Sequence, residues 1–163
     1  MTYGFIGCGN MGGAIAAAVC KKVGAEHVLL ANRTATKAEK LAQELGCNWG
    51  GNADAARCDY VFLGVKPHLM EHMLAEIAPV LKETSPVLVT MAAGLQMERI
   101  QQMAGFSYPV IRIMPNTPSA IGCGMIQYCT SGVSAEQEAD FLDAMSFCGK
   151  LDLLDEKLID AAC

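Results

Sequence analysis

Short apolar runs along the chain alternate with longer stretches in which apolar and polar residues follow the helical period. Apolar runs of about four to eight residues are typical of strands buried on both faces, and the stretches between them are long enough for helices. This alternation predicts an α/β fold, a Rossmann-type doubly wound and mostly parallel sheet. The expected strands are Tyr3–Gly7, His27–Ala31, Tyr60–Val65, Val87–Met91, Val110–Met114, Met125–Cys129 and Leu151–Leu154.

The expected helices connect these strands, and two of them begin with capping-box sequences. In a capping box, a Ser or Thr before the helix and a Glu or Gln three residues later bind each other's backbone N–H groups. Thr36 with Glu39, and Ser134 with Gln137, fit this pattern. The expected helices are 11–22, 36–45, 67–81, 96–103 and a last one that begins after Ser134.

Charge and composition exclude several classes of partner. Apolar residues make up 52% of the 163 residues, and 17 acidic against 12 basic residues give a net charge of −5 without a basic patch. Such a surface does not favour nucleic acid. The longest apolar run, Ala14–Cys20, is far shorter than the roughly 18 residues of a membrane-spanning helix. The N-terminus has no basic segment typical of a secretory signal, so we expect no membrane association and a cytoplasmic location.

The cysteines do not form a pattern typical of disulfides or zinc sites. No two of them are spaced as CxxC, and most stand inside apolar runs. We therefore expect reduced thiols that pack as small apolar side chains. They are Cys8, Cys20, Cys47, Cys58, Cys123, Cys129, Cys148 and Cys163.

The strongest motif is Gly7-Cys8-Gly9-Asn10-Met11-Gly12, which follows the first expected strand and opens the first expected helix. In a GxGxxG turn of this kind, Gly7 makes the tight turn, Gly9 lets the backbone approach a pyrophosphate and Gly12 lets the helix pack on the strand. The N–H groups of the helix N-terminus favour the phosphates. The motif predicts a dinucleotide site, and a glycine-rich turn without a ligand is the alternative.

Residues after the second expected strand indicate NADP(H) in preference to NAD(H). An NAD site has an acidic residue there that accepts a hydrogen bond from the ribose 2′-hydroxyl. This chain has Asn32, Arg33 and Thr34 instead, followed by Lys37. Arg33, Thr34 and Lys37 can bind a 2′-phosphate through charge-assisted hydrogen bonds. The alternative is that Arg33 and Lys37 are ordinary surface charges.

Two further strand ends carry small residues or a proline with a restricted backbone, and such residues suit a cofactor. Gly64, Val65, Lys66 and Pro67 follow one strand, where their backbone can line the ribose and nicotinamide. Met91 with Ala92, Ala93 and Gly94 ends the next strand and leaves room for a flat ring. Lys66 as a catalytic acid is an alternative to an exposed lysine.

Two other features admit a structural as well as a functional interpretation. Asn116 and Thr117 stand in a proline-flanked loop and are candidates for substrate or nicotinamide contacts, or for a turn that binds its own backbone. His68 and His72 have the i, i+4 spacing of a metal pair. Without a third ligand we interpret them as a solvated helix face and expect no metal.

Taken in order, the motifs resemble pyrroline-5-carboxylate reductase along the whole chain. The glycine motif is shared with other reductases, such as hydroxyacid dehydrogenases, whereas the Met114–Pro118 loop is much more specific. The segments that carry the resemblance are Phe5–Gly12, Val65–Pro67, Ala92–Gly94, Met114–Pro118 and Leu158–Ala161.

The resemblance implies NAD(P)H-dependent reduction of 1-pyrroline-5-carboxylate to L-proline, the last step of proline biosynthesis. A protonated imine is already electrophilic, so this reduction needs no strong base. The resemblance also implies cofactor contacts from Ile6 to Met11, from Asn32 to Thr34 near the 2′ position, and from Asn52 near the adenine. It adds contacts from Gly64 to Pro67 and from Ala92 to Gly94. Cys8 stands where relatives often have Ala or Ser, a small change that leaves the turn intact.

The resemblance also implies a helical C-terminal domain after these motifs, which is expected to form a homodimer or larger assembly and to supply the proton donor. The segment 155–163 begins like a helix with Asp155 as its N-cap, but it is shorter than the roughly 12–15 residues of a marginal isolated helix. We expect residues 1–154 to form the NADP(H)-binding domain and 155–163 to begin a helix that continues in the natural chain.

Two alternatives to this function remain open. A non-catalytic NADP(H)-binding sensor would use the same motifs, and a reductase for a different imine or a hydroxyacid would use the same cofactor domain.

Overall fold

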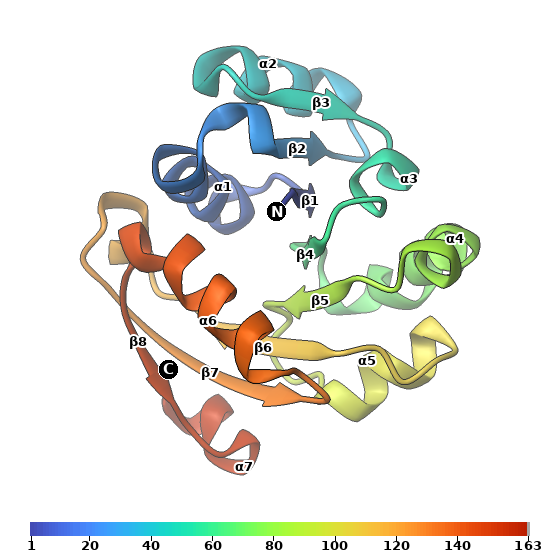
Figure 1. The fold of residues 1–163 in the computed structure, drawn as a ribbon, viewed down its shortest axis with the longest axis vertical. Helices are drawn as coiled ribbons and strands as arrows, with labels where there is room; N and C mark the ends of the chain where they lie inside the picture. Colours follow the sequence, from blue (N-terminus) through green and yellow to red (C-terminus); the bar gives the residue numbers. More distant parts are fainter. Residues whose placement is uncertain (163) are drawn as a thin grey trace.

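An eight-stranded sheet forms the centre of the computed structural model, which describes residues 1–162 (Figure 1). The strand order is β3-β2-β1-β4-β5-β6-β7-β8, and only the β6–β7 pair is antiparallel. The predicted doubly wound, mostly parallel sheet is confirmed. The strands are β1 Tyr3–Ile6, β2 Val28–Ala31, β3 Asn48–Gly50, β4 Tyr60–Leu63, β5 Val87–Thr90, β6 Val110–Met114, β7 Gly124–Ser131 and β8 Gly149–Leu153.

Helices cover both faces of the sheet. One face packs against α1 (Asn10–Val23), α2 (Ala35–Leu45) and α6 (Ala135–Ala144), and the other against α3 (Asn52–Ala55), α4 (Pro67–Thr84), α5 (Met97–Ala104) and α7 (Glu156–Ile159). The inner strands β1, β4, β5 and β6 are buried along their whole length because both of their faces are covered. Short 3₁₀ segments are η1 Ala25–His27, η2 Thr117–Ile121, η3 Ser146–Cys148 and η4 Asp160–Ala162.

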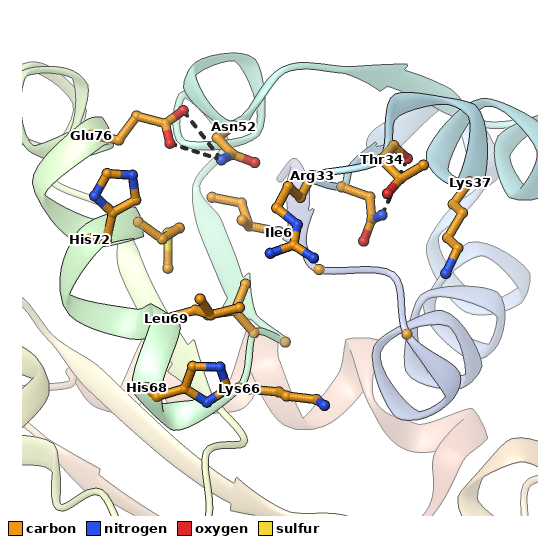
Figure 2. A pocket seen from close by; sticks show the side chains of 16 residues that line it. Ile6, Arg33, Thr34, Lys37, Asn52, Lys66, His68, Leu69, His72 and Glu76 are labelled. Atoms are coloured by element: carbon orange, nitrogen blue, oxygen red, sulfur yellow. Dashed lines mark hydrogen bonds between the residues drawn. The ribbon is translucent and has the colours of Figure 1, made fainter.

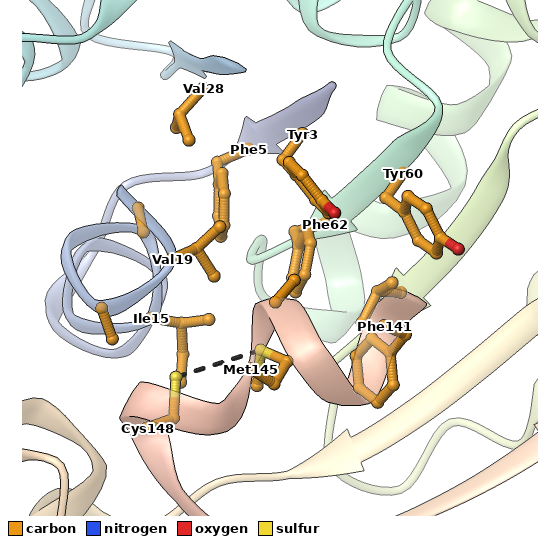
Figure 3. Close-up of a cluster of buried hydrophobic side chains, with 14 of the residues drawn as sticks. Tyr3, Phe5, Ile15, Val19, Val28, Tyr60, Phe62, Phe141, Met145 and Cys148 are labelled. Carbon is orange, nitrogen blue, oxygen red and sulfur yellow. Dashed lines mark hydrogen bonds between the residues drawn. The ribbon is translucent and has the colours of Figure 1, made fainter. Parts of the chain in front are cut away.

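Aromatic side chains of β1 and β4 form the centre of the core on the α1 and α6 side. Parallel register places Tyr3 beside Tyr60 and Phe5 beside Phe62. The rings stack, with centroids 5.4 Å apart in the tyrosine pair and 4.3 Å apart in the phenylalanine pair. Figure 3 shows Phe141 of α6, which covers the same face of the sheet, near these rings in the same cluster. Stacked pairs of this kind contribute roughly 0.5–1.5 kcal/mol beyond the area they bury, so they hold β1 firmly against β4.

Three glycines allow the end of β1, the start of α1 and the end of β4 to meet. Gly7 has φ +96°, a left-handed conformation that glycine adopts without strain. A Cβ on Gly12 would lie 2.3 Å from the Gly7 carbonyl oxygen, and one on Gly64 would lie 2.5 Å from the same oxygen. These contacts are backbone contacts, so neither neighbour can move aside.

The structure differs from the expected elements in two places. Strand β3 and helix α3 have no counterpart in the predicted pattern, because β3 is a three-residue edge strand with Asn48 and Trp49 exposed. The capping box at Thr36 is wrong, since α2 begins one residue earlier after Thr34, without a side-chain cap. The Ser134–Gln137 capping box and the Asp155 N-cap are confirmed.

The cysteines of the described chain are free thiols. Cys20, Cys58, Cys129 and Cys148 are buried, as expected, and Cys8 and Cys47 are half-buried, whereas Cys123 is exposed. Burial raises the pKa of Cys148 to about 12, so this thiol stays protonated at neutral pH. Cys163 lies outside the described residues. Between residues 1 and 162, no helix is long and apolar enough to cross a membrane.

The crossing of α1 and β1 predicts opposite effects for two neighbouring glycines. Gly12→Ala should lower the free energy of unfolding by about 2 kcal/mol or more, because its Cβ meets a backbone oxygen. Gly13→Ala is the matched control, and a helical alanine gains about 0.5–1 kcal/mol. The nearest atom to its Cβ belongs to the flexible Leu41 side chain at 3.2 Å, and the Cys8 carbonyl oxygen is at an ordinary contact distance of 3.9 Å. Urea denaturation of both variants measures the difference, and equal stabilities would contradict the close crossing.

Candidate functional site

A cleft of about 410 Å³ opens at the carboxyl ends of β1, β2 and β4 (Figure 2). The strand order reverses between β1 and β4, and open α/β sheets bind ligands at such a switch point. The walls come from the turn before α1, the loop before α2, the start of α3 and the first turns of α4. The lining residues are Ile6, Gly7, Gly9, Asn32, Arg33, Thr34, Lys37, Asn52, Gly64, Val65, Lys66, His68, Leu69, His72, Met73 and Glu76.

The turn before α1 leaves room for a ligand at Gly9. This residue is the N-cap of α1 and has φ −71° and ψ −171°, a conformation open to any residue. A Cβ on Gly9 would meet nothing within 4 Å. Neither strain nor crowding within the chain explains a glycine here, in contrast to Gly7 and Gly12. The α1 N-terminus also has no side-chain cap, so its first N–H groups remain available to an anion.

Asn32 fixes the glycine turn to the loop before α2. Its Oδ1 accepts a hydrogen bond from the Cys8 backbone N–H at 3.0 Å, and its Nδ2 donates to the Thr34 carbonyl at 3.2 Å. Both ends of the amide are therefore bound to the chain itself. Asn32 sets the spacing between the phosphate side of the cleft and the residues that follow β2.

Cys8 points away from the cleft although its backbone forms part of the turn. Its Sγ donates to the Ala31 carbonyl at 3.4 Å, and burial raises its pKa to about 11. The thiol is therefore protonated at neutral pH.

Three cations face the cleft without a carboxylate partner. Within residues 1–162, Arg33, Lys37 and Lys66 make no ion pair. Figure 2 shows the Arg33 guanidinium pointing into the middle of the cleft. Unpaired cations beside a free helix N-terminus produce a positive potential, which favours an anionic ligand with more than one phosphate.

Helix α4 supplies a wall that the sequence motifs do not indicate. His68, His72 and Glu76 follow one another at four-residue intervals and share the face that lines the cleft. Glu76 accepts a hydrogen bond from Asn52 Nδ2, with both carboxylate oxygens at 3.3 Å. The i, i+4 spacing of the histidines was visible in the sequence, but only the position of α4 shows that this face borders the cleft. Residues 1–162 contain no cluster of three or more His, Cys, Asp or Glu side chains that could hold a metal.

Other predicted site residues lie beside the cleft or away from it. Asn10, Met11, Gly12 and Pro67 adjoin it in sequence, and Ala92 to Gly94 form the loop after β5, but none of these lines it. Asn116 Oδ1 accepts hydrogen bonds from the Met125 N–H at 3.2 Å and from the Ser119 hydroxyl at 3.3 Å. These bonds, one to Ser119 of the same loop and one to the start of β7, engage the Asn116 side chain with the chain itself and support the turn interpretation. Thr117 opens η2.

Comparison with known proteins first identifies the class. The model of the family "NADP oxidoreductase coenzyme F420-dependent" matches residues 2–94, which is more than half of the chain, so the chain belongs to this family. Its match includes the glycine turn, the residues after β2 and the α4 wall.

Within this class, the chain is similar to pyrroline-5-carboxylate reductases. It is 29% identical to that of Aquifex aeolicus over 99% of this chain and 60% of the relative, and 34% identical to that of Corynebacterium melassecola over 98% and 62%. The Plasmodium falciparum pyrroline carboxylate reductase, solved with NADP bound, superimposes with a TM-score of 0.86 at 26% identity, over 99% and 60% of the two chains. The expected resemblance is confirmed, and the chain spans about 60% of the length of these relatives.

The open space at Gly9 predicts a variant that binds poorly but folds well. Gly9→Ala should change the free energy of unfolding by less than about 1 kcal/mol. Alanine is a weaker N-cap than glycine, but it also lowers the conformational entropy of the unfolded chain, and the two effects offset each other. Its methyl group occupies the space above the turn, so NADPH affinity should fall about tenfold or more through lost charge-assisted hydrogen bonds. Denaturation and fluorescence titration measure the two quantities, and unchanged affinity would contradict a ligand at this turn.

Proposed function

We propose that this chain binds NADP(H) across the cleft and forms the cofactor-binding part of a pyrroline-5-carboxylate reductase, which reduces 1-pyrroline-5-carboxylate to L-proline. The observation that carries the proposal is the glycine turn, where Gly9 borders open space beside an uncapped helix N-terminus. That space and those free N–H groups fit a pyrophosphate. The NADP-bound Plasmodium relative supports the choice of cofactor.

Different residues of the cleft would bind the two halves of the cofactor. The pyrophosphate belongs at the turn around Gly9, and the 2′-phosphate belongs beside Arg33, Thr34 and Lys37 at the end of β2. The adenine then lies toward Asn52, and the nicotinamide extends in the other direction, over the ends of β4 and β5. In this arrangement Gly64 and Val65 line the ribose of the nicotinamide half.

The chemical demands on this chain are modest. When bound, the cofactor would supply the hydride for the imine carbon. The residues of the chain would hold the nicotinamide in place and neutralise the charge of the cofactor's phosphates. A protonated imine is already electrophilic, so the cleft needs no strong base. The Lys66 side chain is exposed and makes no ion pair within the described chain, which agrees with the interpretation of an ordinary exposed lysine. Its role as a catalytic acid stays an alternative. The further helical domain, the proton donor and the homodimer implied by the resemblance also stay predictions.

A turnover assay separates the reductase from the alternatives. NADPH oxidation is followed with 1-pyrroline-5-carboxylate for the full-length protein and for this chain beside it. The reductase proposal predicts proline formation by the full-length protein. NADPH binding without turnover of this substrate would contradict the proposal and favour a sensor or a reductase for another imine or hydroxyacid.

The cations after β2 predict a preference for NADPH over NADH. Arg33→Ala should weaken NADPH binding about tenfold or more and leave NADH binding within about twofold, because only NADPH carries the 2′-phosphate. Arg57→Ala is the matched control, since Arg57 pairs with Glu83 on the surface and does not line the cleft. Fluorescence titration with both cofactors measures the affinities, and equal affinities in the unmodified chain would overturn the preference.

A further inference from the structure

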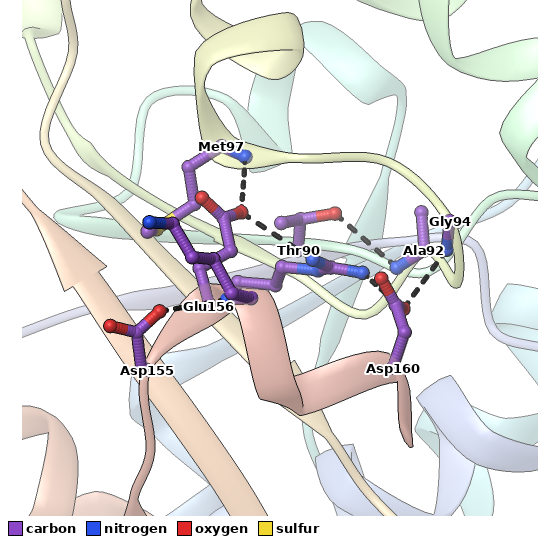
Figure 4. Close-up of polar contacts among 9 residues, drawn as sticks. Thr90, Ala92, Gly94, Met97, Asp155, Glu156 and Asp160 are labelled. Carbon is purple, nitrogen blue, oxygen red and sulfur yellow. Dashed lines mark hydrogen bonds and ion pairs between the residues drawn. The ribbon is translucent and has the colours of Figure 1, made fainter. Parts of the chain in front are cut away.

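The middle of β6 carries a buried arginine whose partners lie at the other end of the chain. Arg112 has no solvent exposure. Its guanidinium binds Glu156 Oε1 at 3.4 Å and Asp160 Oδ1 at 2.5 Å. Glu156 begins α7 and Asp160 begins η4, so these two ion pairs hold the 156–162 segment against the sheet (Figure 4).

The same two carboxylates also hold the loop between β5 and α5. Glu156 Oε1 accepts a hydrogen bond from the Met97 N–H at 2.7 Å, and Asp160 Oδ1 accepts one from the Gly94 N–H at 3.3 Å. Figure 4 shows both contacts on one side of the loop. Gly94 has φ +74°, which gives the loop a sharp bend at the point where Asp160 holds it. Arg112 therefore orients two carboxylates. Asp160 holds the loop at Gly94, and Glu156 holds the first residue of α5, where the loop ends.

Burying this arginine is costly. Stability alone therefore does not explain why a charged residue holds the loop here. Taking a guanidinium out of water is unfavourable, and apolar replacements of buried ion pairs are often neutral or stabilising. Arg112 Nε has no hydrogen-bond partner in the described chain, which adds to the cost. The hydrogen bond from Arg112 lowers the pKa of Asp160, so its carboxylate is ionised at neutral pH and accepts from Gly94.

The position of the loop suggests what its shape is for. Leu63 of β4 pairs with Thr90 of β5, so the loop after β5 lies beside the Gly64–Pro67 segment at the same edge of the sheet. The 2′-phosphate end of the cofactor belongs on the opposite side, at the end of β2. The nicotinamide end of the proposed cofactor therefore reaches the loop that Arg112 holds through its partners.

We propose that Arg112, Glu156 and Asp160 are positioning residues, which hold the Ala92–Gly94 loop in the shape that receives the nicotinamide half of the cofactor. The proposal rests on the proposed NADP(H) function. It assigns the 156–162 segment to the cofactor site, through contacts that none of the motifs indicates.

A comparison of two ligands tests the positioning role. NADPH carries both halves of the cofactor, whereas adenosine 2′,5′-bisphosphate carries only the half that binds near β2. Asp160→Asn should weaken NADPH binding about fivefold or more, the effect of one or two lost hydrogen bonds, and change the bisphosphate affinity less than about twofold. Asp143→Asn is the matched control, because it breaks the Lys22–Asp143 surface pair of 3.0 Å and should change neither affinity.

The outcomes distinguish positioning from a purely structural role. Equal weakening of both ligands, or no weakening of NADPH, would overturn the proposal. Should Asp160→Asn fail to fold, Glu156→Gln removes the charge that holds the loop where α5 begins, and it must show the same difference between the ligands. If the unmodified chain binds the bisphosphate but not NADPH, the positioning proposal fails. If it binds neither ligand, the proposed function fails.

Discussion

The carbonyl oxygen of Gly7 lies where β1, α1 and β4 come together, and only glycines can stand around it. Cβ atoms on Gly12 and Gly64 would approach this oxygen to 2.3 and 2.5 Å. The contact brings the N-terminus of α1 to the edge of the sheet between the ends of β1 and β4. It also sets the place where the strand order reverses, and therefore the place of the cleft. The stacked Tyr3–Tyr60 and Phe5–Phe62 pairs stabilise the same two strands below it.

The cations that line the cleft and the buried arginine of β6 differ in whether the protein itself pairs them. The described chain leaves the cations Arg33, Lys37 and Lys66 unpaired. Arg112, buried two strands beyond β4, instead makes ion pairs with two carboxylates. An unpaired cation attracts an anionic ligand, and a paired one holds the protein itself. In the proposed site, the phosphates are thus recognised mainly through charge, and the nicotinamide is recognised mainly through the shape of the loop after β5.

Much of this arrangement could be predicted from the sequence because local signals determine it. The apolar runs predicted seven of the eight strands, and the GxGxxG spacing predicted the turn with Gly7, Gly9 and Gly12. Strand β3 was missed because a short, exposed edge strand has no apolar run. The α4 wall and the partners of Arg112 depend on tertiary packing, and Asp160 stands 48 residues from Arg112. Arg112 itself was hidden inside an apolar run that predicted only a strand.

The account depends most on one placement, that of the cofactor phosphates. A crystal structure of the chain with NADPH would test it most directly. We predict the pyrophosphate within hydrogen-bond distance of the backbone N–H groups that follow Gly9, and the 2′-phosphate beside the Arg33 guanidinium. A cofactor bound elsewhere on the chain, or one whose 2′-phosphate points away from Arg33, would contradict the account.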